Sequence, residues 1–115
     1  MNPDCLFCKI VQGAIPAKRQ YEDADFLAFH DVAPQAPVHV LIVPKTHIPT
    51  LDDLTAEQAG LMGRLLVLVP RLARDLGLAP DGYRVVMNCR EKAGQSVFHI
   101  HLHLLGGRAM RWPPG

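Results

Sequence analysis

The pattern of apolar and polar positions along the chain predicts one long amphipathic helix in its middle. Thr55, followed three residues later by Gln58, matches a capping box, in which the two side chains bond the first free amides of a helix. Gly77 stands where a left-handed residue commonly ends a helix. Pro70 lacks an amide hydrogen and clashes with the preceding turn, so we expect a kink there or a helix split in two. The apolar positions between these signals recur at helical spacing and line one face: Leu61, Leu65, Leu68, Leu72 and Leu76.

Shorter apolar segments on either side of this helix predict a sheet. Asp4 is placed to cap a short helix that Gly13 ends, and Pro16 begins an extended segment after it. The mixed order of elements, without alternating strand–helix repeats, indicates an α+β fold with an antiparallel sheet of about five strands, one long helix and one short helix. Four of the strands are expected over Phe26–His30, Val38–Val43 (closed by Pro44), Tyr83–Met87 and Phe98–Leu104.

Composition narrows the possible functions. A chain of 115 residues with 49% hydrophobic and 20% charged residues suits a single compact domain over residues 1–115. Its net charge of +1, without a basic stretch, argues against nucleic acid as a partner. The longest apolar run, Leu65–Val69, is too short to cross a bilayer, and the N-terminus does not resemble a signal peptide. We therefore expect a cytoplasmic protein with no membrane partner, whose three cysteines are free thiols or metal ligands.

The chemistry is concentrated in His99-Ile100-His101-Leu102-His103. In a strand, alternate side chains share one face, so the three histidines would project together, with neighbours roughly 6.6 Å apart. The middle ring can then attack a substrate while the outer two support it. A three-histidine catalytic zinc site is the alternative. The preceding Ala93–Val97 offers a glycine turn, an amide and a hydroxyl, which are the groups that a phosphate oxygen needs from a loop.

The segment Gln95–Arg108 resembles the signature of the histidine triad (HIT) superfamily, specifically its Hint nucleotide-binding branch. The resemblance implies a single HIT domain whose sheets are joined in a homodimer. It also implies a hydrolase of nucleoside 5′-phosphoramidates (AMP-linked amines) or acyl-adenylates, acting through a nucleotidyl-histidine intermediate. Two rival functions remain: a dinucleoside polyphosphate hydrolase of the same superfamily, and a non-catalytic nucleotide-binding regulatory module. The resemblance extends to Ile15–Lys18, Ala28–Asp31, Pro34–Pro37, Pro44–Ile48, Asp75–Leu78, Gly82–Arg84 and Arg111–Gly115.

The resemblance also assigns roles to residues. His101 is the nucleophile, with catalytic support from Ser96, His39, His99 and His103. The phosphate and leaving-group contacts are His103 and Ser96, and Asn88, Gly94 and Gln95 complete the pocket. Asp31 accepts hydrogen bonds from the ribose hydroxyls, and His30 edges the pocket. Apolar walls around a purine base fall to Phe7, Ile10, Ile15, Phe29 and Val32, for which plain core packing is the alternative.

Cys5-x-x-Cys8 has the spacing of half a tetrahedral zinc site, and a pair of packed cysteines is the alternative. Some members of the superfamily place such a pair with two histidines around structural zinc, which here implies Cys5, Cys8, His47 and His99 as ligands. The substrates expected are a purine nucleoside monophosphate and AMP-linked amines. Few acidic residues lie near the histidine motif, so no magnesium requirement is expected.

Overall fold

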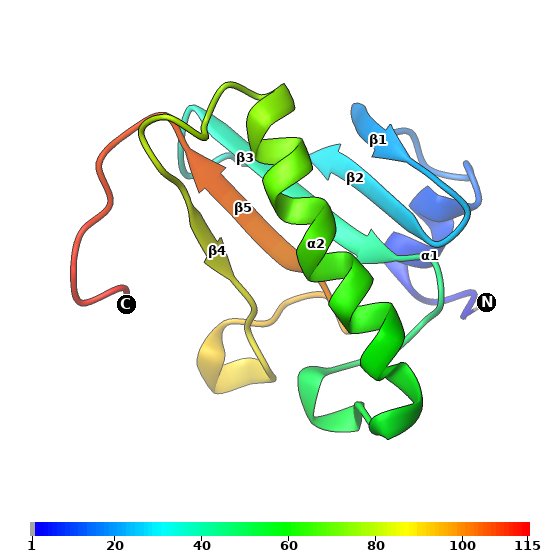
Figure 1. The fold of residues 1–115 in the computed structure, drawn as a ribbon. Coiled ribbons are helices and arrows are strands. Elements are labelled where there is room, and N and C mark those ends of the chain that lie inside the picture. The colour runs from blue at the N-terminus through cyan, green and yellow to red at the C-terminus, as the bar shows by residue number, and fades with distance from the viewer. Residues whose placement is uncertain (1) are drawn as a thin grey trace.

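The computed structural model describes residues 2–115 as an antiparallel sheet with one helix on each face (Figure 1). The five strands lie in the order β1-β2-β3-β5-β4, and every neighbouring pair is antiparallel. This confirms the α+β class, the sheet and both helices. The elements are α1 (Leu6–Val11), β1 (Arg19–Glu22), β2 (Phe26–His30), β3 (Val38–Pro44), α2 (Ala59–Asp75), β4 (Arg84–Val86) and β5 (Leu102–Gly106), with short 3-10 turns at Leu51–Asp53, Ala56–Gln58 and Glu91–Ala93.

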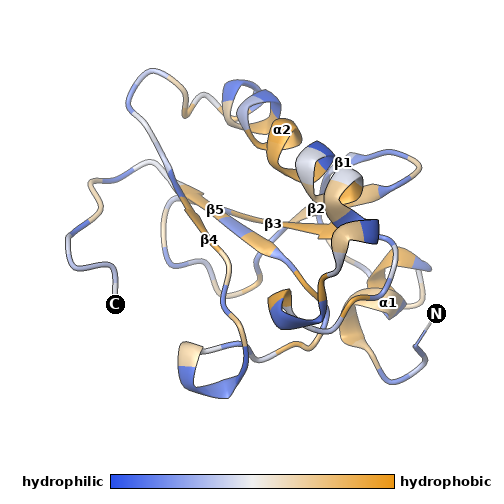
Figure 2. Cartoon of the chain, turned by 60° about the horizontal axis from the view of Figure 1, so that its bottom comes forward, coloured by the Kyte–Doolittle hydropathy of each residue, from blue (hydrophilic) through white to orange (hydrophobic). Residues whose placement is uncertain are grey.

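Alternation along the central strands separates two hydrophobic layers. In β3, Val40 and Ile42 face α2, whereas Leu41 and Val43 face α1. Figure 2 shows the sheet between the two helices. Register then places His103 of β5 opposite Leu41, on the α1 face, while Leu102 and Leu104 enter the α2 core. The same alternation that builds the core therefore directs polar residues of these strands toward the short helix.

The long helix forms where the leucine periodicity predicts it. Thr55 makes the predicted capping box with Gln58, although the turn that it caps is a 3-10 turn that leads directly into α2. Gly77, with a φ of +75°, adopts the expected left-handed conformation after the helix. The predicted split at Pro70 is wrong, because α2 is one helix of 17 residues containing it. Pro70 leaves the carbonyl of Leu66 without a donor, and both residues are exposed, so water can replace the missing bond.

Two predicted boundaries need correction. The cap of α1 is Cys5, whose sulfur accepts from the Cys8 amide at 3.3 Å, and not Asp4. The strand predicted over Phe98–Leu104 begins only at Leu102. Its first part cannot continue the ladder, because the partner position on β3 is Pro44, and the Ile100 amide instead donates to the carbonyl of Ile48 at 2.7 Å.

The predicted strand Tyr83–Met87 is also shorter than expected, since only Arg84–Val86 pair with β5. Among residues 2–115, no helix combines the length and the apolar character needed to cross a membrane.

Candidate active site and metal cluster

A cavity of about 370 Å³ opens on the α1 face of the sheet. Side chains from α1, the segment after it, the end of β2, β3 and the start of β5 converge on it, so residues far apart in sequence share one wall. One end is apolar, and the other carries histidines, a serine hydroxyl and a single carboxylate. The lining residues are Leu6, Phe7, Ile10, Ile15, Pro16, Ala17, Phe29, His30, Asp31, Val32, Leu41, Ser96, Val97, His101 and His103.

His101 presents one unprotonated ring nitrogen to this cavity. Its Nδ1 lies 2.7 Å from the carbonyl oxygen of His99, and a carbonyl can only accept, so Nδ1 carries the proton. In a neutral ring, Nε2 then keeps its lone pair. Burial lowers the pKa of His101 below its usual value, which keeps the ring neutral at physiological pH. The ring also packs edge-on against Phe7, at 5.0 Å between centroids, so it is held in place on a second side.

A second chain of hydrogen bonds fixes the protonation of His103. The Gln35 amide donates to Nδ1 of His39 at 3.1 Å, so that nitrogen is unprotonated and Nε2 of His39 carries the proton. His39 Nε2 lies 2.9 Å from Nδ1 of His103, which must accept. His103 is therefore left with Nε2–H as a donor. Burial, and to a lesser extent the neighbouring His101 and His39, lower the pKa of His103 to about 4.

Asp31 lies at the end of β2, beside these rings. One carboxylate oxygen accepts from the Ala33 amide at 2.8 Å, which shapes the turn after the strand. The other lies 3.5 Å from Nε2 of His39. The carboxylate thus has free lone pairs at the cavity wall and also favours the tautomer of His39 described above.

The residues expected around a purine base line the apolar end of the cavity. The rings of Phe7 and Phe29 pack edge-to-face, with centroids 5.4 Å apart, and both belong to the core on the α1 side of the sheet. The same two side chains therefore contribute to the core and to the cavity wall. Val32 is 99% exposed at the rim. His30 also lines the cavity, and its Nε2 is 2.9 Å from the side-chain oxygen of Gln20.

Part of the expected phosphate loop does not reach the cavity. Gln95 is 4% exposed, and its side chain is bonded to backbone groups: it accepts from the Arg90 amide at 2.7 Å and donates to the carbonyl of Pro49, outside the loop, at 2.8 Å. Its amide and that of Gly94 are also bonded to carbonyls of the same loop. Neither residue lines the cavity, and nor does Asn88. Of this segment, Ser96 and Val97 line it, so the expected contacts of Asn88, Gly94 and Gln95 with a ligand stay predictions.

Several residues that line the cavity were not predicted as site residues, namely Leu6, Pro16, Ala17, Leu41 and Val97. Leu41 could have been found, because it is two residues from His39 on a strand and so shares its face. The others depend on how the segment after α1 and the Ser96 loop fold back over the sheet, which no local pattern reports.

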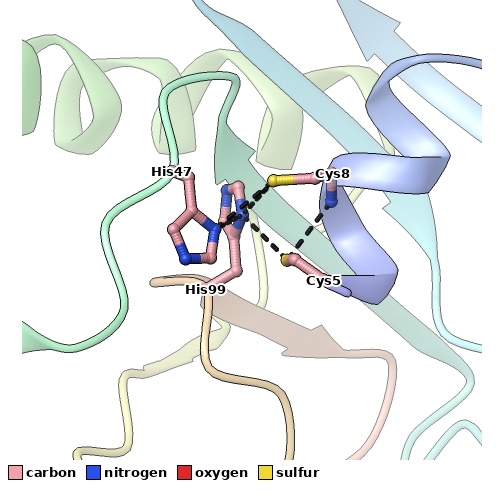
Figure 3. Close-up of side chains that lie close together, drawn as sticks. All are labelled: Cys5, Cys8, His47 and His99. Atoms are coloured by element: carbon pink, nitrogen blue, oxygen red, sulfur yellow. Dashed lines mark hydrogen bonds between the residues drawn. The ribbon is translucent and has the colours of Figure 1, made fainter. Parts of the chain in front are cut away.

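Four potential metal ligands meet beside the cavity (Figure 3). Their ligand atoms all lie within 4.8 Å of one another. Nδ1 of His99 is 3.4 Å from the sulfur of Cys5 and 3.5 Å from that of Cys8. Nδ1 of His47 is 3.3 Å from the sulfur of Cys8 and 3.2 Å from Nδ1 of His99. Zinc bonds of ~2.3 Å to sulfur and ~2.0 Å to nitrogen place tetrahedral ligand atoms ~3.3–3.8 Å apart, so the cluster fits such an ion.

Protonation of the cluster also suits a metal. Nε2 of His99 lies 2.7 Å from the Pro44 carbonyl and must donate to it, which leaves Nδ1 unprotonated toward the two sulfurs. Burial raises the pKa of the Cys5 thiol, so a cation is needed to hold it as a thiolate. His99 consequently serves two centres, with its ring in the cluster and its carbonyl on His101.

Comparison with known proteins identifies the family to which the chain belongs. The HIT domain family matches residues 12–110. The chain is 51% identical to an uncharacterised HIT-like protein of Synechococcus elongatus over the full length of both. It is 44% identical to the purine nucleoside phosphoramidase of Escherichia coli K12, over 96% of this chain and 92% of the relative. The crystal structure of a HIT family hydrolase from Legionella pneumophila is 53% identical, with a TM-score of 0.96, covering 97% of this chain and all of that one. The chain therefore belongs to the HIT domain family.

Proposed function

We propose that this protein hydrolyses purine nucleoside 5′-phosphoramidates or acyl-adenylates, with His101 as the nucleophile. The observation that carries the proposal is the hydrogen bond of 2.7 Å from His101 Nδ1 to the His99 carbonyl. It leaves Nε2 with a lone pair at a cavity that also holds donors for a phosphate. The similarity to a purine nucleoside phosphoramidase supports the same substrate class.

In the first step, Nε2 of His101 attacks phosphorus and the bond from phosphorus to the leaving amine breaks. The amine takes up a proton, which the hydroxyl of Ser96 on the cavity wall can donate while it regains one from solvent. The ring becomes a phosphorylated imidazolium, and its positive charge is stabilised by the Nδ1–H bond to the His99 carbonyl. Neutral His103 donates Nε2–H toward the phosphoryl oxygens.

In the second step, water attacks phosphorus, the bond from phosphorus to Nε2 breaks, and AMP and neutral His101 are released. The proton that water loses returns to solvent and balances the one that the amine took up. The balance is one water consumed for one amine and one nucleotide formed. Among residues 2–115, Asp31 is the only acidic residue that lines the cavity, so these side chains offer little to hold magnesium there. We expect turnover without added magnesium.

The test compares wild type with His101→Gly on adenosine 5′-phosphoramidate. The variant should lose ~10³-fold or more in turnover and still bind AMP, and added imidazole should restore part of the activity by filling the space left by the ring. Acid-free quenching of wild type should trap AMP on the protein. Near-normal turnover by the variant, with no adduct in wild type, would contradict the proposal.

The same assay separates the rival functions. Faster cleavage of diadenosine polyphosphates than of adenosine 5′-phosphoramidate would identify a dinucleoside polyphosphate hydrolase. Tight AMP binding with no cleavage of either substrate would identify a nucleotide-binding module.

We also propose that Cys5, Cys8, His47 and His99 hold zinc. Two thiolates and two imidazoles make a closed four-coordinate set, and such an ion supplies structural cross-linking rather than a reactive water. The ligands come from α1, the segment after β3 and the segment before β5. Zinc would thus connect the wall of the cavity to the segment that carries His101.

A homodimer is the third part of the proposal. Figure 1 shows the segment after β5 running away from the sheet, and its Trp112 is 84% exposed. A large aromatic side chain in a proline-rich tail suits a partner surface better than water. Trp112 is the only tryptophan. Sedimentation should give a dimer at micromolar concentration, and dilution to monomer should shift Trp112 emission to longer wavelength. A monomer with unchanged emission would contradict the proposal.

A further inference from the structure

Arg108, just beyond β5, reaches back to the loop between β2 and β3. Its Nε and Nη2 both donate to the carbonyl of Gln35, at 3.2 and 3.0 Å, and Nη1 donates to the carbonyl of Ala109 at 3.0 Å. The planar guanidinium is thus held at both edges. Arg108 does not line the cavity, so these contacts have no direct part in binding a ligand there.

The neighbouring Gly107 brings the same two segments into close packing. Its φ is +91°, and a Cβ at this position would lie 2.9 Å from Cβ of Pro37. Only glycine permits both the backbone conformation and the approach. The segment that follows β5 therefore contacts the loop over residues 31–37 at two points. Arg108 donates to the carbonyl of Gln35, and Gly107 packs against Pro37.

Hydrogen bonds connect these contacts to the histidines. The carbonyl of Gln35 accepts from Arg108, and the backbone amide of the same residue donates to Nδ1 of His39 at 3.1 Å. His39 then donates Nε2–H to Nδ1 of His103 at 2.9 Å, and His103 keeps Nε2–H for the cavity. If His39 instead carried its proton on Nδ1, its Nε2 would have to accept from His103. Nε2 of His103 would then carry a lone pair, which repels a phosphoryl oxygen.

We propose that Arg108 is a positioning residue of the triad. It holds Gln35 in place, so that the backbone amide of Gln35 selects the tautomers of His39 and His103. The inference rests on the proposed function in one respect, since His103 is taken to donate to the phosphoryl group. The tautomers themselves follow from the hydrogen bonds and are measurable without any substrate.

The test uses ¹⁵N-histidine-labelled wild type, Arg108→Ala, Arg108→Lys and a matched control, Arg74→Ala, which removes an exposed arginine at the end of α2. The imidazole ¹⁵N shifts distinguish protonated from unprotonated ring nitrogens. We expect Nε2–H on both His39 and His103 in wild type and in the control, and averaged shifts in Arg108→Ala. Arg108→Lys, which keeps the charge and one donor, should lie between them.

Kinetics with adenosine 5′-phosphoramidate give the second readout. Arg108→Ala should lower kcat by about fivefold, the worth of one ordinary hydrogen bond, with little change in KM. Wild-type tautomers and kcat in a folded Arg108→Ala would overturn the inference, as would equal changes in Arg74→Ala. If Arg108→Ala does not fold, Arg108→Lys decides by the same criteria. Absence of turnover in wild type would count against the proposed function alone, because the ¹⁵N shifts would still judge Arg108.

Discussion

Acid should destabilise this protein in part through His103, and substituting that residue should remove that part of the effect. Burial lowers the pKa of His103 from 6.5 to about 4 in the folded chain. As the pH falls below 6.5, the unfolded chain takes up a proton that the folded chain refuses. The contribution to stability is thus complete above pH 6.5 and is lost progressively as the pH approaches 4.

The magnitude follows from those two values. Between pH 7.5 and pH 4.5, the difference in proton uptake amounts to about 2–3 kcal/mol of unfolding free energy. In His103→Gln this contribution is absent, while other titrating groups, and any metal, are shared with wild type. The variant should therefore lose about 2–3 kcal/mol less than wild type over that pH interval.

Urea unfolding followed by far-ultraviolet circular dichroism, at one protein concentration and at both pH values, measures the difference. Wild type and His103→Gln losing the same free energy would refute the reasoning. It would mean that the His103 ring takes up its proton in the folded chain near its ordinary pKa.

Three further predictions concern the metal cluster and the packing. Protein purified without chelator should contain close to one zinc per chain, and Cys8→Ser should contain far less; wild type without metal, after expression with zinc supplied, would return both cysteines to simple packing. Leu72→Ala should cost ~2–5 kcal/mol in chemical denaturation, because Leu72 is 0% exposed between α2 and the sheet, and a cost below 1 kcal/mol would contradict that packing. Gly107→Ala should destabilise more than Gly13→Ala, because both residues have positive φ but only Gly107 has a neighbour in the way; equal melting temperatures would count against the Pro37 contact.

The parts of the fold that were predictable depend on neighbours in sequence. Leucine spacing and the Thr55 cap identified α2, and the apolar, β-branched run Val38–Val43 identified β3. The parts that were not predicted depend on partners far along the chain. The start of β5 is set by Pro44 and by the Ile48 carbonyl, and Gln95 turns inward because the Pro49 carbonyl is there to receive its amide.

The candidate site divides in the same way. Residue types and the resemblance singled out the three histidines, Asp31 and the four metal ligands. The structure places His101, His103 and Asp31 on the cavity and His99 with Cys5, Cys8 and His47. What the sequence analysis lacked was the direction of each hydrogen bond. Which nitrogen of His101 is free depends on the His99 carbonyl, and backbone carbonyls have no signature in a sequence.

The double use of His99 separates what point mutations can alter in this protein. Its ring belongs to the metal cluster, but the group that orients His101 is its carbonyl, which every amino acid possesses. A change of residue at this position removes one of the four proposed zinc ligands and leaves the acceptor for the proposed nucleophile, His101, in the chain. Single substitutions can therefore remove the proposed metal ligands, whereas the orientation of the His101 ring changes only if the path of the backbone changes. A related protein without the four ligands could therefore keep the same orientation of His101, provided that other packing holds the peptide of His99 in place.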